Sequence, residues 1–240
     1  MKKKTNRHFL ETALRIFSKS AHLLFELSSK FLPSDGVIFM FHDVGKNGGI
    51  LNLPKEEFES LLKKLCKKNT VRLEEWEKSK NFFALTFDDV PESFYENAFP
   101  LLKKYDLPFT LFISTTLLDT PGYLTSAQLK EISACELSTI GSHGKAHCFF
   151  RELSKKSALE DLINSQKTLE EKTNRKIILY AFPYGSFFAC GFWKKSLVSK
   201  IYKYGFSSVG VPISRWSPLP KYFLPRINAS IKQIKNYINT

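Results

Sequence analysis

The sequence predicts an α/β domain of mostly parallel strands, in which about seven strand–helix units close, or nearly close, a barrel. Short apolar runs rich in β-forming residues alternate with segments whose apolar residues recur at helical spacing, and this alternation is typical of parallel sheets. Polar residues suited to chemistry follow several of these runs, at the strand ends that carry active sites in such barrels. The 240 residues suit one domain, because single cores stop growing near ~250–300 residues.

The strands and helices follow from local patterns along the chain. Pro91 suits the first turn of a helix, while Thr125 and Ser154 suit the position that caps one. The predicted strands cover residues 37–42, 82–87, 108–113, a short run before Gly141, 177–182 and 206–211. The predicted helices cover residues 55–68, 91–104, 125–134, 154–174 and 192–204, and a loop over 218–227 leads into a last short segment.

The first 35 residues are predicted to form a separate amphipathic helix, followed by the main domain over 36–240. Apolar residues recur at helical spacing over about 5–32 with Lys and Arg between them, and breaker residues follow at 33–36. The pattern leaves two alternatives open. The helix packs against the domain, or it lies on an anionic membrane surface.

Charge and cysteine content narrow the partners and the compartment. The net charge of +13 attracts anions, but the basic residues are spread along the chain and no nucleic-acid module is found, so no nucleic-acid partner is expected. The four cysteines form no CxxC pair and suggest reduced thiols. No signal-peptide core and no membrane-spanning apolar stretch is found. We therefore expect a cytoplasmic protein, and the basic N-terminus leaves open a peripheral attachment to the inner face of the membrane.

Two adjacent carboxylates, Asp88 and Asp89, follow the apolar run at 82–87. Consecutive residues at a strand end point in different directions, so one carboxylate can bind a metal while the other takes a proton from water. A polar loop that caps the helix beginning near Pro91 is the alternative.

Two of the five histidines, His143 and His147, lie four residues apart beside a glycine-containing turn. This spacing suits a divalent metal if the segment is helical or turns tightly. Two histidines leave a site incomplete, and Asp88 or Asp89 is a candidate for the missing oxygen ligand. Cys148 is a conceivable further ligand, although a buried apolar role is more usual for such a cysteine.

A third motif, Phe182-Pro183-Tyr184-Gly185, follows the predicted strand at 177–182. A turn fixed by Pro and Gly can direct a backbone N–H into a cleft, where it stabilises an oxyanion. An ordinary tight turn is the alternative.

The order and spacing of these three motifs resemble the polysaccharide deacetylase family, the NodB-homology group of carbohydrate esterase family four, over about residues 36–230. The motifs are Thr86-Phe87-Asp88-Asp89, Gly141-Ser142-His143 to His147, and Phe182-Pro183-Tyr184-Gly185. The resemblance implies a distorted (β/α) barrel and a metal held by Asp89, His143 and His147. It also implies that Asp88 is the general base and that the backbone N–H of Tyr184 helps to hold the oxyanion.

Two more segments resemble the poly-N-acetylglucosamine deacetylase branch of this family. They are Met40-Phe41-His42-Asp43-Val44 and Leu224-Pro225-Arg226-Ile227. In that branch the early histidine acts as the general acid, which implies that His42 protonates the leaving amine. Arg226 is expected to pair with Asp88 and keep it ionised and oriented. A satisfied core histidine and a purely structural ion pair are the alternatives.

The sequence also departs from the family pattern. Gly144 replaces the usual Ser or Thr after the first metal histidine, and Val90 replaces a glycine after the carboxylate pair. Ala181 and Phe182 occupy the stretch where many members have an arginine, and no late Leu-x-His motif is found. The last two departures fit the branch that relies on His42, and all of them leave room for altered activity.

The predicted function is that of a metal-dependent hydrolase that removes N-acetyl groups from the sugars of a polysaccharide or glycan precursor. Zinc is the expected cofactor, but a ligand set of one aspartate and two histidines also suits cobalt, nickel or iron. The alternative is a non-catalytic glycan-binding domain that retains the deacetylase fold.

Overall fold

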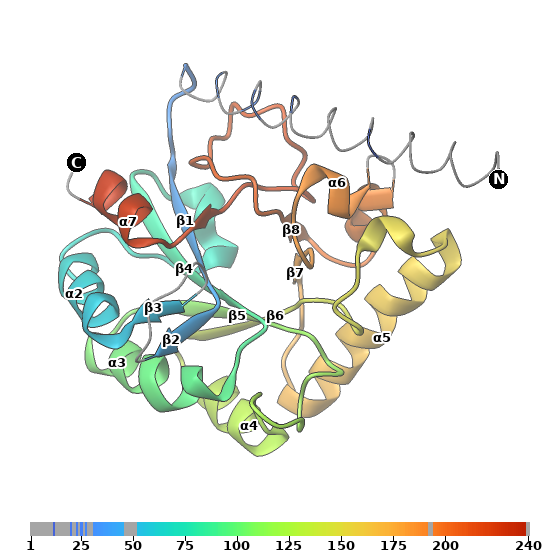
Figure 1. Cartoon of the computed structure of the whole chain (residues 1–240), viewed down its shortest axis with the longest axis horizontal. Helices are drawn as coiled ribbons and strands as arrows, with labels where there is room; N and C mark the ends of the chain where they lie inside the picture. The colour runs from blue at the N-terminus through green and yellow to red at the C-terminus, as the bar shows by residue number, and fades with distance from the viewer. Residues whose placement is uncertain are drawn as a thin grey trace.

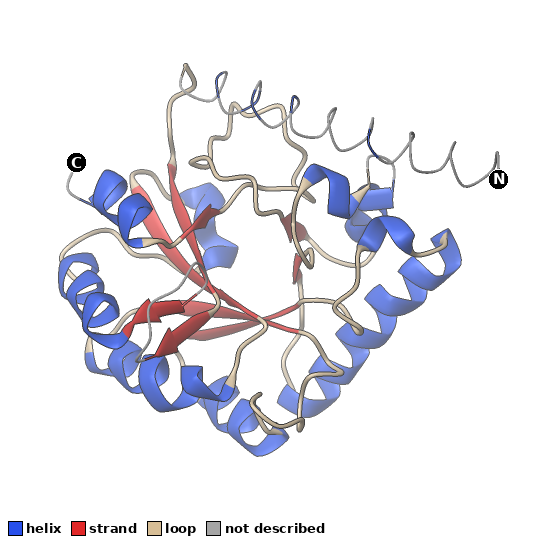
Figure 2. Ribbon diagram, in the orientation of Figure 1, coloured by secondary structure: helices blue, strands red, loops and turns tan. Residues whose placement is uncertain are grey.

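The protein is built around a seven-stranded sheet whose paired strands are all parallel (Figures 1 and 2). The computed structural model describes residues 31–45, 52–191 and 194–238, together with residues 12, 20, 23, 25 and 27. In spatial order the strands are β8 (Tyr204–Phe206), β7 (Leu179–Ala181), β6 (Ser138–Ser142), β5 (Phe109–Ile113), β4 (Phe82–Asp88), β1 (Gly36–Phe41) and β9 (Ile227–Asn228). The predicted α/β class with parallel strands is confirmed.

The sheet curls towards a barrel, and one short segment connects its two edges. Leu224 pairs with Phe206 at the end of β8, and three residues later Ile227 pairs with Phe39 of β1. The segment 224–228 thus runs from one edge of the sheet to the other and leaves the barrel nearly closed. Arg226 lies within this segment and is completely buried.

Neighbouring residues of the central strands pack on opposite faces of the sheet. Ile38 and Ala84 belong to one apolar cluster, whereas Phe39 and Leu85 belong to a larger one. This alternation follows from the two-residue period of a strand. Both faces are buried, and the continuous apolar runs of the sequence reflect this.

Helices surround the sheet in an outer arc (Figure 1). Thr125 and Gln128 form a capping box at the start of α4 (Ser126–Ala134), and the Ser154 side chain caps α5 (Lys155–Thr173). The predicted helices at 125–134 and 154–174 are therefore confirmed. The α-helices are α2 (Lys55–Leu65), α3 (Phe99–Lys104), α4 (Ser126–Ala134), α5 (Lys155–Thr173), α6 (Phe187–Cys190) and α7 (Ile231–Ile238). The 3₁₀ helices are η1 (Leu73–Lys78), η3 (Phe150–Glu152) and η4 (Lys194–Lys200), and η2 (Phe94–Ala98) is a π-helix.

Several predicted boundaries are wrong. The strand expected over 206–211 ends at Phe206, because that residue pairs with Ala181, the last residue of the neighbouring strand β7. Val209 and Val211 are buried without lying in a strand, so their apolar character reflects core packing. The helix expected over 192–204 is the 3₁₀ helix η4, and the strand expected over 177–182 covers three residues.

A second sheet was not predicted. It pairs β2 (Asp43–Gly45) with β3 (Asn52–Pro54), two strands too short to show periodicity in the sequence.

The helix predicted over 5–32 lies almost entirely outside the described residues. Of those described, Phe25 is buried, whereas Leu23 and Leu27 are exposed. No described helix has the length and apolar character needed to cross a membrane. The division at residue 35 and the surface role of the N-terminal segment stay predictions.

Candidate active site

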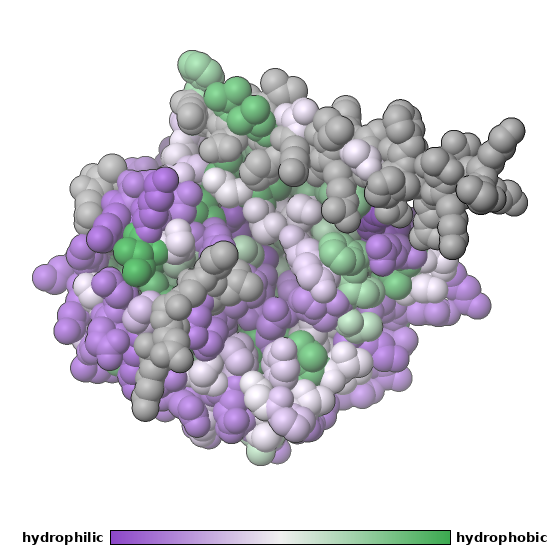
Figure 3. Space-filling model, in the orientation of Figure 1, coloured by the Kyte–Doolittle hydropathy of each residue, from purple (hydrophilic) through white to green (hydrophobic). Residues whose placement is uncertain are grey.

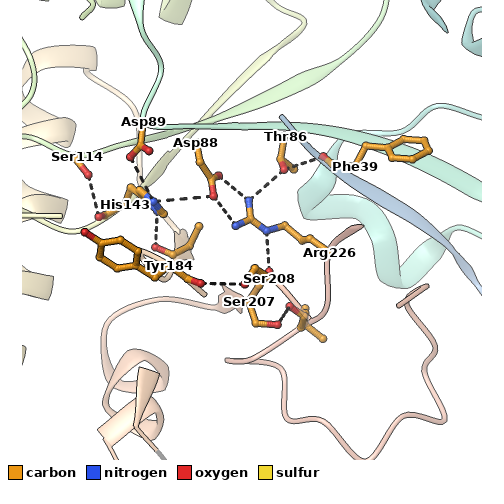
Figure 4. Close-up of polar contacts among 12 residues, drawn as sticks. Phe39, Thr86, Asp88, Asp89, Ser114, His143, Tyr184, Ser207, Ser208 and Arg226 are labelled. Atoms are coloured by element: carbon orange, nitrogen blue, oxygen red, sulfur yellow. Dashed lines mark hydrogen bonds and ion pairs between the residues drawn. The ribbon is translucent and has the colours of Figure 1, made fainter. Parts of the chain in front are cut away.

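The seven predicted catalytic and metal-binding residues line a single pocket of about 440 Å³ at the carboxyl ends of the strands, and Cys148 does not line it. The barrel brings them together from five separate stretches of the chain (Figure 4 shows most of them). The lining residues are Met40, His42, Asp88, Asp89, His143, His147, Phe182, Tyr184, Gly185, Ser208, Arg226 and Asn228.

The two adjacent carboxylates point to different partners, as predicted. Asp88 contacts Arg226, while Asp89 contacts His143 (Figure 4). Asp89 also contacts His147. A tight turn separates the two side chains, with the Val90 N–H donating to Asp88 O (2.6 Å). Asp89 and Val90 both have positive φ, at 59° and 43°. A positive φ is unusual for a β-branched residue such as Val90, so the fold holds this turn in a conformation that glycine adopts more easily.

Asp89, His143 and His147 form a cluster suited to a metal ion. One candidate ligand atom from each residue lies within 4.8 Å of the other two. Asp89 Oδ1 lies 2.9 Å from His147 Nε2 and 3.6 Å from His143 Nε2. The segment 143–147 is not helical, so the two imidazoles converge through a turn in which His147 has a φ of 43°.

The contact on the far side of the His143 ring sets its tautomer. His143 Nδ1 lies 2.9 Å from the carbonyl oxygen of Ala181, and a carbonyl only accepts, so Nδ1 carries the proton. Burial lowers the pKa of His143, although Asp88 and Asp89 oppose this effect. The ring is therefore neutral, and its free lone pair is on Nε2, which faces Asp89.

The cluster fits a divalent cation. Asp89 Oδ1 is buried and has no hydrogen-bond donor among the described residues, despite its short approach to His147. A buried carboxylate oxygen without a donor is costly, and a cation would satisfy it. One carboxylate and two imidazoles suit zinc and related metals.

Asp88 is held by a buried arginine. Arg226 Nη1 and Nη2 donate to Asp88 Oδ1 and Oδ2, each at 2.7 Å, and Asp88 and Arg226 are 2% and 0% exposed. Burial by itself raises the pKa of Asp88, but the Arg226 guanidinium outweighs it and lowers the pKa to about 2. Asp88 is therefore ionised at neutral pH.

The sequence did not identify the residues that position Arg226. Its Nε donates to Ser207 O (3.1 Å), and its Nη1 also donates to Thr86 Oγ1 (3.1 Å), which in turn donates to Phe39 O. Thr86 is the first residue of the motif Thr86-Phe87-Asp88-Asp89, and its place in this motif was the one sequence feature that could have indicated its role. Ser207 contributes only a backbone carbonyl, and no sequence pattern indicates such a role.

Tyr184 presents its backbone and its ring to different surroundings. The residue has a φ of 62°, and its N–H finds no acceptor in the described part of the chain. The residue is 51% exposed, and its ring stacks on Phe149 with centroids 4.1 Å apart. The N–H therefore remains available for a ligand, and the ring forms part of the rim of the pocket.

His42 follows β1 and lines the same pocket. Its Nδ1 is buried without a hydrogen-bond partner among the described residues. The imidazole faces the pocket, and the role of His42 as the general acid stays a prediction.

The model of the polysaccharide deacetylase family matches residues 76–209, which is more than half of the chain. This chain belongs to the polysaccharide deacetylase family. The matched region includes Asp88, Asp89, His143, His147 and Tyr184, so the predicted resemblance is confirmed.

Two curated bacterial members of the family show moderate similarity to this deacetylase-family chain. YxkH of Bacillus subtilis (strain 168) is 27% identical over 65% of the chain and 58% of its own length. The poly-beta-1,6-N-acetyl-D-glucosamine N-deacetylase of Staphylococcus aureus (strain MSSA476) is 28% identical over 60% of the chain and 52% of its own length. The chain thus spans only a little more than half the length of these relatives.

A solved structure supports the fold. The Streptococcus pyogenes deacetylase PplD, determined with acetate, superimposes with a TM-score of 0.77 at 23% identity, over 87% of this chain and 98% of that one. At this identity the similarity establishes a shared deacetylase-type barrel.

Proposed function

We propose that this chain is a metal-dependent deacetylase that removes N-acetyl groups from the sugars of a polysaccharide or glycan precursor. The main support is that one pocket contains both a set of candidate metal ligands and a candidate general base. Asp89, His143 and His147 converge for a cation, and Asp88 lies beside them, with Oδ2 at 4.0 Å from His143 Nε2. A non-catalytic glycan-binding domain needs neither metal ligands nor a general base.

Asp88 is proposed to act as the general base. Its carboxylate offers about four lone-pair sites, of which Arg226 uses two, so the others remain available to a water in the pocket. A divalent cation held by Asp89, His143 and His147 would supply Lewis acidity, which polarises a carbonyl and lowers the pKa of water. This chemistry offsets the low basicity of an arginine-bound carboxylate.

Tyr184 and His42 are proposed to act on the amide itself. The free Tyr184 N–H can donate to the carbonyl oxygen as negative charge develops there during attack. His42 can donate a proton to the nitrogen, since an amine leaves a tetrahedral carbon readily only when protonated. The products are acetate and a sugar with a free amino group.

The substrate class is proposed from the names of relatives and from the rim of the pocket. The Staphylococcus aureus relatives are named as poly-beta-1,6-N-acetyl-D-glucosamine N-deacetylases. The exposed Tyr184 ring, held flat by Phe149, offers an aromatic face against which a sugar ring can pack. An N-acetylglucosamine unit is therefore the substrate to test first.

Purified protein loaded with Zn²⁺ is expected to release acetate from N-acetylglucosamine oligomers. A chelator should abolish the release, and added Zn²⁺ or Co²⁺ should restore it, because three pocket residues hold the cation. Acetate measured by a coupled assay checks this. If folded, zinc-loaded protein binds the oligomers but releases no acetate, the glycan-binding alternative replaces the enzyme.

We also propose that the protein works in a reducing compartment at a membrane surface. All four cysteines are free thiols, which is typical of the cytoplasm. Several large apolar side chains are exposed, and Figure 3 shows apolar surface at the upper edge of the molecule. The exposed residues at the N-terminal end and on the loop near Phe25 are Leu23, Leu27, Phe31 and Trp216.

Cell fractionation checks this proposal. The protein is expected in the cytoplasmic membrane fraction at low salt, with partial release by high salt, because basic residues weaken their hold on anionic lipids when screened. Full recovery in the soluble fraction at low salt would exclude the membrane association.

A further inference from the structure

The two histidines of the metal cluster are joined by only three residues, Gly144, Lys145 and Ala146. These residues are not helical, and positive φ values at Gly144 (79°) and His147 (43°) bend the segment sharply. The relative positions of the two imidazoles therefore depend on the conformation of this loop. An isolated turn of this kind has no helical hydrogen bonds to hold it.

A buried carboxylate on another element binds the backbone of this loop. Asp161, on helix α5, accepts hydrogen bonds from the Lys145 N–H through Oδ2 (3.0 Å) and from the Ala146 N–H through Oδ1 (3.3 Å). Asp161 is 9% exposed and lies on the face of α5 that also buries Ala158 and Leu162. An acidic residue at a core-facing position is unusual, because burying a carboxylate is costly unless it is well paired.

The other side of the loop is also held. The Gly144 N–H donates to Ser142 Oγ (3.1 Å), and the Gly144 carbonyl accepts from the Thr115 N–H (3.2 Å). The Lys145 carbonyl accepts from the Thr116 N–H (3.1 Å) and its hydroxyl (2.7 Å). Asp161 thus supplies the two acceptors that the loop's remaining N–H groups need.

The close approach of Asp161 also accounts for the residue at position 144. A Cβ added to Gly144 would lie 2.8 Å from Asp161 Oδ2 and 3.4 Å from the Tyr180 hydroxyl. Together with the positive φ, this contact leaves room only for glycine. Gly144 and Asp161 therefore form a matched pair.

We propose that Asp161 is a positioning residue, whose carboxylate holds the loop 144–146 so that His143 and His147 face Asp89 before a cation arrives. The proposal rests on the proposed metal site. Groups that orient metal ligands typically change metal affinity by about 10–100-fold when removed. Asp161 orients the two histidines indirectly, by binding the backbone N–H groups of Lys145 and Ala146, which lie between them.

The test is the affinity of the purified, full chain for Zn²⁺, measured by competition with a chromophoric chelator, for Asp161→Asn and Asp161→Ala. Zinc affinity should fall about 10–100-fold in both, and less in the asparagine variant, which keeps one acceptor oxygen. Glu160→Gln is the matched control. Glu160 precedes Asp161 on α5, its side chain is 56% exposed, and among the described residues it pairs only with Lys156, at 3.9 Å. The zinc affinity of this variant should therefore equal that of the wild type.

A purely structural role predicts a different result. In that case the unfolding temperature of the metal-free variants falls while the zinc affinity of the folded protein stays unchanged, and this outcome overturns the proposal. If the wild-type protein itself binds no Zn²⁺, the metal site and the proposed function fail instead.

Two further measurements test the pairing and the preorganisation of the loop, and the second needs only the wild-type protein. Gly144→Ala should weaken zinc binding in the wild-type background and have a smaller effect in Asp161→Ala, because the clash disappears with the carboxylate; equal effects would contradict the pairing. In the metal-free wild type, the amide hydrogens of Lys145 and Ala146 should exchange slowly, and exchange at the rate of an open loop would rule out preorganisation.

Discussion

Asp88→Asn is expected to lower the rate of acetate release by a factor of about 10²–10⁴, the usual contribution of a general base. The substitution keeps the shape of the side chain but removes the charge that accepts a proton. Zinc affinity should change little, since the three cluster residues are untouched. Acetate release at saturating Zn²⁺, together with a zinc titration of the same sample, checks both expectations.

Two comparisons make this result specific. Asp89→Asn should lose zinc affinity as well as activity, because it alters a predicted ligand. His42→Gln should lose acetate release from N-acetylated sugars but keep hydrolysis of an activated aryl acetate, whose leaving group needs no proton. Near wild-type turnover by Asp88→Asn would refute its role as the base. Equal losses on both substrates in His42→Gln would refute its role as the acid.

Arg226→Met is expected to destabilise the fold by about 3–5 kcal/mol, the usual cost of leaving one partner of a buried ion pair alone. Arg226 is completely buried and donates to both oxygens of Asp88, to Thr86 and to the backbone of Ser207. The segment that carries it also joins the two edges of the sheet. Urea unfolding of the metal-free protein measures the loss.

A less buried pair supplies the control. Arg215 Nε binds Asp35 Oδ1 at 2.8 Å, but the Arg215 side chain is 38% exposed and Asp35 also accepts from the Arg215 backbone N–H (2.6 Å), so Arg215→Met should cost less than Arg226→Met. The double variant Asp88→Asn/Arg226→Met should recover part of the stability lost in Arg226→Met, because no unpaired charge remains. A cost for Arg226→Met as small as that of Arg215→Met would show that the buried pair is not needed for folding.

The same pair predicts how the difference in stability depends on pH. The folded-state pKa of Asp88, about 2, lies below its ordinary value of 3.8, so the stabilisation is fully present above pH 3.8. It is lost as the pH falls from there through 2. The difference between wild type and Asp88→Asn, in which position 88 does not titrate, should therefore shrink over that interval and stay constant from pH 5 to 7.

Much of the site could be predicted because its residues occur in short, ordered motifs. Asp88 and Asp89 follow a buried strand, His143 and His147 have ligand spacing, and Tyr184 occupies a Pro-Gly turn, so each signal lies within a few residues of the chain. The pairing of Arg226 with Asp88 was also expected, but only through the resemblance. The strand predicted over 206–211 was wrong because Val209 and Val211 are buried in the larger apolar cluster without lying in a strand.

Local sequence patterns were enough to predict the class of fold, the family and the residue types of the site, since periodicity and motif order are local properties. How those residues are held depends on contacts between distant parts of the chain. Asp88 and Arg226 are 138 positions apart, His143 binds a carbonyl 38 positions away, and Asp161 reaches a loop 15 and 16 positions earlier. These contacts depend on barrel closure and on the packing of α5, and many of them involve backbone atoms, which every residue type has and no sequence pattern distinguishes.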